Sequence, residues 1–380
     1  MTNAAGPSDS PGSVYLDAAS SEPLHPVARD TLLAALDHGW ADPRRLHGPA
    51  RNARLLLDNA REVVAACLGV RRDEVSFTSS GTEAVNLGLL GLAQGRERVG
   101  RRIVHAAVEH QSVHHAAAWW GEPVEVGVDR HGRVREDDLV EASAASGTAV
   151  VALQHANHEV GTVQPVDDVR LAADVPLFVD ACASMGRLPL PERWAAVAGS
   201  AHKWGGPAGV GVLLVRTGAR WASPFPADDR VDHRATGFEN VPAALAAAAA
   251  LQAVVAERDA VNARHRELID LVRERVAAIP DVDVVGDPVG RLPHLVTFSC
   301  LYVDGEALVT ELDRHGIGVA SGSACTASTL EPSHVLAAMG ALTHGNVRIS
   351  LTRTTTRDDV ERFLAVLPDV VARLRAEVGL

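Results

Sequence analysis

The sequence predicts an α/β protein with a mainly parallel, doubly wound sheet in a large domain and a smaller α+β domain beside it. Short runs rich in β-branched residues alternate with longer helical patterns through the first two thirds of the chain. Such alternation is typical of a parallel sheet covered by helices. The chain has 380 residues, which exceeds the roughly 250–300 residues that one hydrophobic core usually serves and favours two domains.

Seven segments have the length and composition of strands in the large sheet. They are Val75–Thr78, Ile103–Ala106, Val124–Val128, Ala149–Leu153, Leu177–Asp180, Ala196–Ala198 and Gly211–Val215. Helices are expected at Ala50–Leu68, where apolar residues recur at helical spacing, and at Thr82–Leu92.

The pattern changes after Val215. An alanine-rich stretch from Val241 to about Ile279 predicts one long helix, with Asn240 at its N-cap and Pro242 in its first turn. Shorter strands and a closing helix are expected at Val282–Val285, Leu295–Cys300, Ile317–Ala320, Val347–Leu351 and Arg357–Val378.

These patterns predict a large domain over residues 22–250 and a small domain that combines residues 14–21 with 251–380. Residues 1–13 are polar and rich in Gly, Pro and Ser, which predicts a disordered leader without a signal-peptide core. The net charge of −12 argues against nucleic-acid or membrane-surface binding. The longest apolar run is too short to span a bilayer. Four widely spaced cysteines form no disulfide or zinc pattern, so we expect no metal site and a reducing, cytoplasmic location.

Lys203 is the only lysine among 36 lysine and arginine residues. Arginine can replace lysine as a charge but cannot form an imine, because its guanidinium stays protonated. Lys203 is therefore either a reactive amine or a surface lysine that was retained by chance and has no chemical role. It lies in Gly-Ser-Ala-His-Lys-Trp-Gly-Gly-Pro (199–207), where small residues let a cofactor approach the backbone closely.

Three further segments place polar groups at the ends of expected strands, where open α/β sheets bind ligands. Asp180 ends an apolar strand; its carboxylate either keeps the pyridine nitrogen of pyridoxal phosphate (PLP) protonated or caps the next helix. Gly81 and Thr82 begin a helix after a hydroxyl-rich turn, which either holds a phosphate or only caps the helix. His110 follows a third strand, where an imidazole can stack on a ring.

Together, in this order, these segments resemble the cysteine desulfurase family, which are fold type I PLP enzymes of the class V aminotransferase group. The resemblance runs from Val14 to the C-terminal helix and implies a large domain with a mainly parallel seven-stranded sheet. The matching motifs are Phe-Thr-Ser-Ser-Gly-Thr-Glu (77–83), Val-Glu-His (108–110), His-Ala-Asn-His-Glu-Val-Gly (155–161), Val-Asp-Ala (179–181), Ser-Ala-His-Lys (200–203) and Ser-Gly-Ser-Ala-Cys-Thr (321–326). The last motif separates desulfurases from other members of the group.

The resemblance implies a role for each motif. Lys203 forms the Schiff base with PLP and later moves protons, His110 stacks on the ring and acts as acid or base, and Asp180 pairs with the pyridinium. The phosphate is held by Gly81, Thr82, Ser200 and His202. Asn157 lies near the ring hydroxyl and the substrate, and Arg353 binds the substrate carboxylate through its bidentate guanidinium.

The resemblance also implies that Cys325 is the reacting thiol. Its Ser/Gly/Ala-rich surroundings have little to pack, which favours a loop, although a small buried position in a strand is the commoner fate of a free cysteine. Cys67 and Cys300 fit that commoner fate, and Cys182, two residues after Asp180, is assigned no chemistry. L-cysteine would become L-alanine, and its sulfur would stay as a persulfide on the Cys325 thiolate.

As implied by the resemblance, the protein is a homodimer whose active sites lie near the subunit interface, and the persulfide passes to an acceptor protein. Acceptors in the family include iron–sulfur scaffolds, tRNA-thiolation enzymes and small sulfur carriers. Two alternatives stay open. One is a selenocysteine lyase or another PLP β-lyase that does not need Cys325, and the other is a weakly active homologue that serves as a scaffold.

Four departures from the family's pattern indicate a divergent member with a dedicated acceptor or an altered substrate preference. Ala183 stands where the family usually has a Gln that hydrogen-bonds the cofactor's ring hydroxyl. Phe238, in Gly-Phe-Glu-Asn (237–240), replaces a residue that often contacts the phosphate of the second subunit. Asp42 stands where an amide often lies near the substrate, and Ser-Ser (20–21) replaces a pair of threonines.

Overall fold

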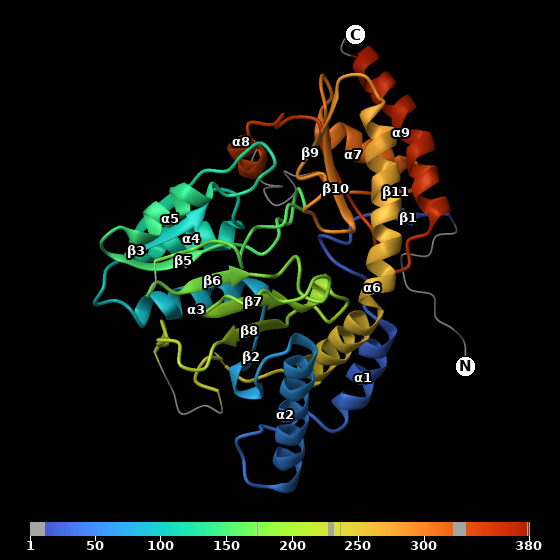
Figure 1. Cartoon of the computed structure of the whole chain (residues 1–380). Helices are drawn as coiled ribbons and strands as arrows, with labels where there is room; N and C mark the ends of the chain where they lie inside the picture. Colours follow the sequence, from blue (N-terminus) through green and yellow to red (C-terminus); the bar gives the residue numbers. More distant parts are fainter. Residues whose placement is uncertain are drawn as a thin grey trace.

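The computed structural model describes residues 12–172, 174–226, 232–235, 237–321, 332–377 and 379. A seven-stranded sheet occupies one side of the molecule and two short sheets occupy the other (Figure 1). The long helix α6 (Val241–Ala277) runs along both parts. Its predicted start is confirmed, because the Asn240 side chain accepts a hydrogen bond from the Ala243 amide (3.2 Å) and a proline lies in the first turn.

The large sheet has the strand order β2-β8-β7-β6-β5-β3-β4. Only β8 runs antiparallel to its neighbours, so the predicted mainly parallel seven-stranded sheet is confirmed. The strands are β2 (Val75–Thr78), β3 (Arg102–Ala106), β4 (Glu122–Val126), β5 (Thr148–Ala152), β6 (Leu177–Asp180), β7 (Ala196–Ser200) and β8 (Gly211–Val215). Every residue of β5, β6 and β7 is buried, which explains their continuous apolar composition.

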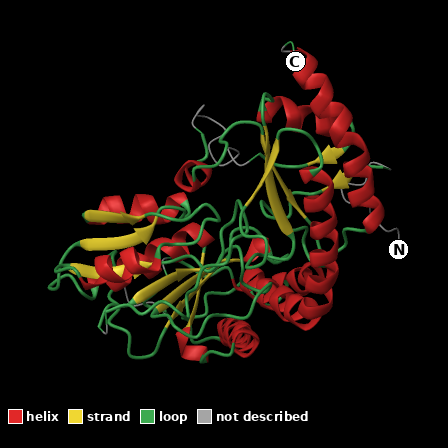
Figure 2. Cartoon of the chain, turned by 45° about the horizontal axis from the view of Figure 1, so that its top comes forward, coloured by secondary structure: helices red, strands yellow, loops and turns green. Residues whose placement is uncertain are grey.

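Helices cover both faces of this sheet (Figure 2). Alternate residues of the strands face the two helix layers. Val179 of β6 belongs to the core on the side of α2 (Gly48–Leu68), and the adjacent Phe178 belongs to the core on the side of α3 (Gly81–Gln94). A Cβ on Gly88 would lie only 2.6 Å from the Phe178 ring, so glycine lets α3 approach the sheet closely. The other helices of this part are α1 (Pro26–Leu36), α4 (Gln111–Trp120) and α5 (Glu136–Ala144), with short 3₁₀ turns η1 (Arg72–Glu74) and η2 (Ala201–Lys203).

The second part has its own apolar core, which contains Val14 and Leu16 from the N-terminal arm. Its three-stranded antiparallel sheet has the order β12-β10-β9, and β1 pairs with β11 in parallel. Its elements are β1 (Val14–Tyr15), β9 (Val282–Val285), β10 (Leu295–Cys300), α7 (Gly305–Arg314), β11 (Ile317–Gly318), β12 (Asn346–Ser350) and α9 (Arg357–Glu377). The short helix α8 (His334–Met339) instead packs its buried residues into the core of the large sheet.

Helix α6 contributes to both cores, with Leu251 packed in the first and Leu268 in the second. By length and composition alone, α6 is also the one helix among the described residues that could cross a membrane. Half of its most apolar window is buried within the structure, so packing against the two cores accounts for that composition.

Candidate active site

A cavity of about 300 Å³ lies at the carboxyl ends of the parallel strands. Ligands bind at this edge in open α/β sheets. The structure brings seven of the residues singled out in the sequence into its lining: Gly81, Thr82, His110, Asp180, Ser200, His202 and Lys203. They come from segments spread over more than 120 positions, so the fold itself assembles the site.

One wall of the cavity is the start of α3. The Ser80 side chain caps this helix by accepting a hydrogen bond from the Glu83 amide (3.0 Å). Gly81 has no room for a side chain, because a Cβ there would lie 2.7 Å from the Ser200 Cβ and 3.1 Å from the Cys182 Sγ. Opposite this turn, the Ser200 hydroxyl lies 3.1 Å from His202 Nδ1. A helix N-terminus that carries a glycine and is faced by hydroxyl and imidazole groups fits a phosphate.

Asp180 ends β6 with its side chain almost fully buried. Its Oδ1 accepts a hydrogen bond from the Cys182 amide (2.9 Å). Glu109, also buried, accepts a hydrogen bond from the Gln154 amide (2.6 Å). Burial, and secondly the charge of Asp180, hold the pKa of Glu109 well above its ordinary value. Asp180, which lines the cavity whereas Glu109 does not, is the carboxylate that can pair with a pyridinium.

His110 is the N-cap of α4. Its Nδ1 accepts a hydrogen bond from the Ser112 amide (3.1 Å) and lies 2.8 Å from the Ser112 hydroxyl. This arrangement leaves the ring hydrogen on Nε2. Burial lowers the pKa of His110, and the nearby Asp180 partly opposes that shift. A neutral imidazole is thus held rigidly at the cavity, edge to face with His158 at 5.0 Å between ring centroids.

Lys203 lies in η2, and its ammonium Nζ donates a hydrogen bond to the carbonyl of Ala19 in the N-terminal arm. The arm is tied to β12, because the Ala19 amide donates to the Ser350 hydroxyl (2.8 Å). The Lys203 carbonyl accepts a hydrogen bond from Arg187 (3.3 Å). The only lysine of the chain is therefore enclosed at the junction of the two parts of the molecule rather than left on a solvated surface.

The structure corrects the predicted carboxylate-binding arginine. Arg353 does not line this cavity: β12 ends at Ser350, and Arg353 lies beyond it in a separate small cavity beside Glu22 and Arg187. The Arg353 amide donates to Glu22 Oε1 (2.8 Å). The strand end could not be placed from the sequence, where both arginines occur within Arg-Ile-Ser-Leu-Thr-Arg (348–353).

Arg348, within β12, is the arginine that lines the cavity. Its guanidinium donates to Asp17 (2.9 Å), to the Ser20 hydroxyl (2.6 Å) and to the His158 carbonyl (3.1 Å). Its Nε is buried and makes no hydrogen bond to the described part of the chain. Arg348 is thus a buried, oriented cation facing the cavity that contains Lys203, as a binding group for a carboxylate must be.

Asn157 is buried but does not line the cavity. Its Nδ2 donates to the Val108 carbonyl (3.0 Å), and its Oδ1 accepts from the amides of Glu159 and Val160 (2.8 Å each). These bonds fix the turn that presents His158 to the cavity. A direct contact between Asn157 and a cofactor or substrate stays a prediction.

Cys325 lies outside the described residues, so its predicted role as the reacting thiol stays a prediction as well. The three cysteines that the structure describes are free thiols. Burial raises the pKa of Cys182 well above its ordinary value, raises that of Cys300 to about 11, and raises that of Cys67. None of these three is therefore prepared to act as a thiolate.

A model of the class-V aminotransferase family matches residues 14–363 of the sequence. The chain belongs to this family. It is 34% identical over 376 residues to cysteine desulfurase IscS of Dictyoglomus turgidum, with 95% of each chain covered. It is 37% identical over 382 residues to the IscS-like cysteine desulfurase of Mycobacterium tuberculosis, with 95% of this chain and 97% of the relative covered.

A solved structure of a NifS-like protein superposes with a TM-score of 0.87 at 27% identity, covering 95% of this chain and all of the other. These similarities confirm both the resemblance seen in the motifs and the fold type I architecture. Class-V aminotransferases and cysteine desulfurases are PLP enzymes, which agrees with the donor groups around the cavity.

Several cavity residues were not predicted from the sequence. Arg348, His158, Ser112 and Gln154 all line the cavity, and Ser20 was noted only as a departure from the family's pattern. His158 lies within the motif at 155–161 and Gln154 directly precedes it, so that motif could have indicated both residues. Ser112 follows His110 by two residues and could have been predicted from the preference for serine near helix starts.

Proposed function

We propose that the protein is a PLP-dependent cysteine desulfurase that converts L-cysteine to L-alanine and retains the sulfur as a persulfide on Cys325. This proposal rests on the cavity described above. The only lysine of the sequence, a buried carboxylate, a neutral imidazole and the N-terminus of a helix that can bind a phosphate all line it. The activity is that of the curated relatives, which are named cysteine desulfurases and match nearly the whole chain.

The residues of the cavity fit PLP. The first turn of α3 with Ser200 and His202 would hold the phosphate, Asp180 would pair with the pyridinium nitrogen, and Lys203 would form the covalent link. PLP linked to a lysine supplies an electron sink that stabilises negative charge developing on a bound amino acid.

Each side chain then has a task set by its position. Arg348 would bind the carboxylate of L-cysteine, since Asp17 and Ser20 already orient its guanidinium. Lys203 would move the proton at the substrate Cα, and His110, neutral because of burial, would accept or donate a proton at the substrate thiol. The buried setting strengthens these charge interactions relative to water.

Sulfur transfer is a displacement at the substrate sulfur. The Cys325 thiolate would form a bond to that sulfur while the bond between the sulfur and the substrate Cβ breaks. The electron pair of the broken bond stays with the substrate, whose Cβ takes up a proton to become the methyl group of L-alanine. The persulfide would then be handed to an acceptor; we propose iron–sulfur scaffolds, tRNA-thiolation enzymes and small sulfur carriers as the classes to test.

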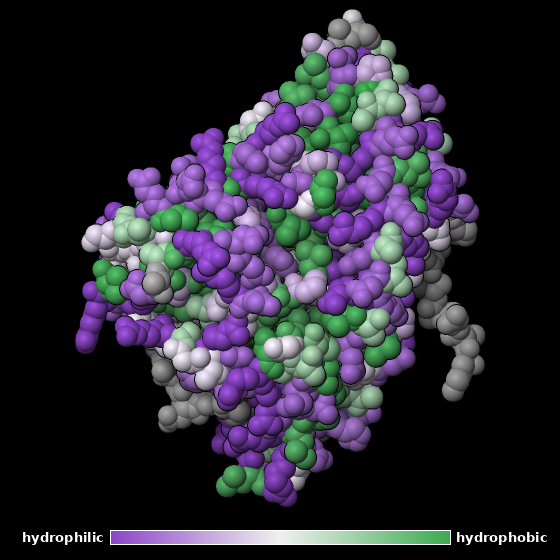
Figure 3. Space-filling view, viewed as in Figure 1, coloured by the Kyte–Doolittle hydropathy of each residue, from purple (hydrophilic) through white to green (hydrophobic). Residues whose placement is uncertain are grey.

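We also propose that the enzyme is a homodimer. Both α1 and α2 pack against α6 and lie at the same end of the molecule (Figure 1). The large apolar side chains most exposed on these helices and on the loop between them are Leu33, Leu36, Trp40, Leu46 and Leu55, which are 51–89% exposed. Apolar residues also come to the surface near α2 in Figure 3. If this surface is the dimer interface, the double variant Leu46→Glu, Leu55→Glu should be monomeric in analytical ultracentrifugation. A double variant that is still dimeric would place the interface elsewhere.

Mass spectrometry of the holoenzyme after incubation with L-cysteine tests the proposed function. We expect one additional sulfur on the peptide that contains Cys325, together with L-alanine in solution. Cys325→Ala should abolish both, whereas Cys67→Ala, on the outer helix α2, serves as the matched control. Full alanine release by Cys325→Ala would overturn the persulfide mechanism and favour the lyase alternative.

The scaffold alternative is supported by Ala183 and Phe238. Ala183 lines the cavity and provides no hydrogen-bond donor for a ring hydroxyl, and Phe238 is half exposed on the surface. A visible absorbance band of lysine-bound PLP in the purified protein supports the enzyme. Absence of that band after reconstitution with PLP would favour the scaffold.

A further inference from the structure

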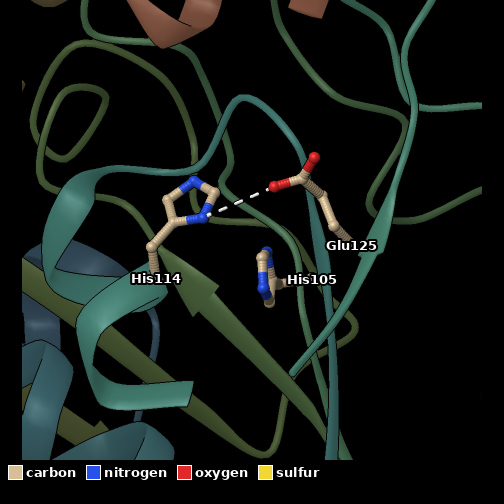
Figure 4. A group of neighbouring side chains, drawn as sticks. All are labelled: His105, His114 and Glu125. Atoms are coloured by element: carbon tan, nitrogen blue, oxygen red, sulfur yellow. Dashed lines mark ion pairs between the residues drawn. The ribbon is translucent and has the colours of Figure 1, made fainter. Parts of the chain in front are cut away.

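A second cluster of chemically reactive side chains lies on the unit β3–α4–β4, outside the residues assigned to the cofactor cavity. It consists of His105 in β3, His114 in α4 and Glu125 in β4 (Figure 4). His105 and Glu125 are directly paired in the parallel β3–β4 ladder. Helix α4 connects these two strands and lays His114 over the pair. The cluster is therefore created by strand register and crossover packing.

The three side chains converge closely enough to share one ion. One nitrogen or oxygen atom from each residue lies within 4.8 Å of those from the other two. His114 Nδ1 is 3.7 Å from Glu125 Oε2, and the two imidazole rings are 4.7 Å apart at their centroids. A tetrahedral zinc ion bound at about 2.0–2.2 Å needs ligand atoms about 3.3–3.6 Å apart. The Glu125 side chain is 59% exposed, so it can rotate toward the two imidazoles when an ion binds.

Both imidazoles have electron pairs to offer. His105 Nδ1 lies 3.3 Å from the Ala106 carbonyl, a contact that places the ring hydrogen on Nδ1 and leaves the lone pair on Nε2. Metal-binding histidines commonly use such a carbonyl contact to fix the ring. Burial lowers the pKa of His105, and mainly through burial the pKa of His114 falls to about 4. The feature that favours a metal ion is the convergence of the three ligand atoms within 4.8 Å of one another.

The two ring nitrogens of His114 have different surroundings, and Nδ1 is the one that lies near Glu125. The His114 Nε2 is buried without a hydrogen-bond partner in the described part of the chain. The Glu109 carbonyl accepts a hydrogen bond from His334 (2.9 Å) and also contacts His114, where it partly opposes the fall of the His114 pKa. A neutral imidazole 3.7 Å from a carboxylate does not form an ion pair, so His114 alone stabilises the charge of Glu125 only weakly. In contrast, His334 packs against His114 but has both ring nitrogens in hydrogen bonds, which excludes it as a ligand in this arrangement.

We propose that His105, His114 and Glu125 bind one divalent transition-metal ion, for which zinc is the probe, with water at the fourth position. Two imidazole nitrogens and one carboxylate oxygen suit zinc, cobalt or nickel, whereas magnesium and calcium prefer sites made of oxygen ligands alone. Because Glu125 is exposed at an edge strand, the ion is exchangeable. The bound ion would link α4 to the edge strand of the sheet, one helical turn away from His110 in the cofactor cavity.

Zinc binding to the chelator-stripped holoenzyme tests this site. Equilibrium dialysis against free zinc, followed by elemental analysis, gives affinity and stoichiometry for wild type, Glu125→Gln and His114→Gln. Glu122→Gln is the matched control, because Glu122 is an exposed carboxylate three residues away on the same strand and 4.0 Å from Arg102. His115→Gln is the control for the exposed neighbouring imidazole on α4.

Wild type and both controls should bind one zinc ion. Glu125→Gln and His114→Gln should bind zinc at least tenfold more weakly, because each has lost a direct ligand. Cobalt in place of zinc should give tetrahedral ligand-field bands in wild type that Glu125→Gln lacks. The exposed Glu125→Gln change is not expected to disturb folding, and an unchanged thermal transition without metal would verify that. The proposal is overturned if wild type binds no zinc, or if Glu125→Gln binds it as well as Glu122→Gln does.

Discussion

Two imidazoles one turn apart on α4 illustrate how surroundings, rather than residue type, determine a side chain's chemistry. His110 and His114 are both neutral because burial lowers the pKa of each. His110 is held by Ser112 at the cavity that Asp180 and Lys203 also line. His114 instead meets His105 and an exposed carboxylate at the sheet edge. The first therefore suits proton transfer and the second suits a metal ion.

The largest expected effect concerns the cofactor side of this comparison. Lys203→Arg keeps a positive charge but cannot form an imine, so the visible band of bound PLP should vanish and L-alanine formation should fall by about 10³-fold or more. An absorbance scan and an alanine assay measure both. Zinc binding at the sheet edge should be unaffected, and a variant that kept the PLP band would show that the cofactor is not attached at Lys203.

A smaller loss is expected for His110→Gln, which should lower kcat by about 10²-fold because a positioned general acid or base is removed. The pH profile separates catalysis from mere positioning. Since burial lowers the pKa of His110, its neutral form persists as the pH falls to the ordinary histidine value of about 6.5. Wild-type kcat/KM should therefore decline only below that pH, and His110→Gln should lack this decline. An acid limb that survived in the variant would assign it to another group.

The corrected arginine gives a third prediction. Arg348→Lys should raise KM for L-cysteine about 10–100-fold, because hydrogen bonds to charged groups contribute about 1.5–3 kcal/mol. Arg353→Lys, outside the cavity, is the matched control and should change KM by less than about threefold. Steady-state kinetics with L-cysteine measure both KM values. A larger rise in KM for Arg353→Lys than for Arg348→Lys would identify Arg353 as the carboxylate-binding residue.

The smallest effect is expected from restoring a donor near the cofactor. Ala183 faces the cavity and an apolar cluster that includes Leu292. Ala183→Gln should slow the loss of PLP during dialysis by up to about tenfold, the contribution of one hydrogen bond. Ala183→Leu, similar in size but without a donor, is the control. Equal retention by both variants would mean that another group already meets the ring hydroxyl.

The cofactor side of the comparison could be predicted from the sequence because its information is local. Asp180 ends an apolar run, Gly81 stands at a strand-to-helix turn, and Lys203 is unique in the chain. Strands β2, β6 and β8 were predicted with their observed bounds. At the edge strand β4 the prediction was shifted by two residues, because pairing with β3 begins at the charged Glu122 rather than in the apolar run.

What the sequence could not provide was register and the exact ends of strands. His105 and Glu125 are twenty positions apart and fit no ligand spacing, so an expectation based on cysteine spacing excluded a metal site. Only the β3–β4 ladder sets them side by side. Arg353 was predicted in place of Arg348 for a similar reason, since the choice depends on where β12 ends. Helix α4 itself was not predicted, because its short apolar face is interrupted by histidines.

Side-by-side analysis of His110→Gln and His114→Gln tests the central claim most directly, by measuring L-alanine formation and bound zinc in the same preparations. We expect His110→Gln to lose about 10²-fold in rate and to keep its zinc. His114→Gln should lose zinc while its rate falls by less than about threefold, since it touches no cofactor group. Loss of zinc by His110→Gln, or a collapse of the rate in His114→Gln with zinc retained, would contradict the division of labour along α4.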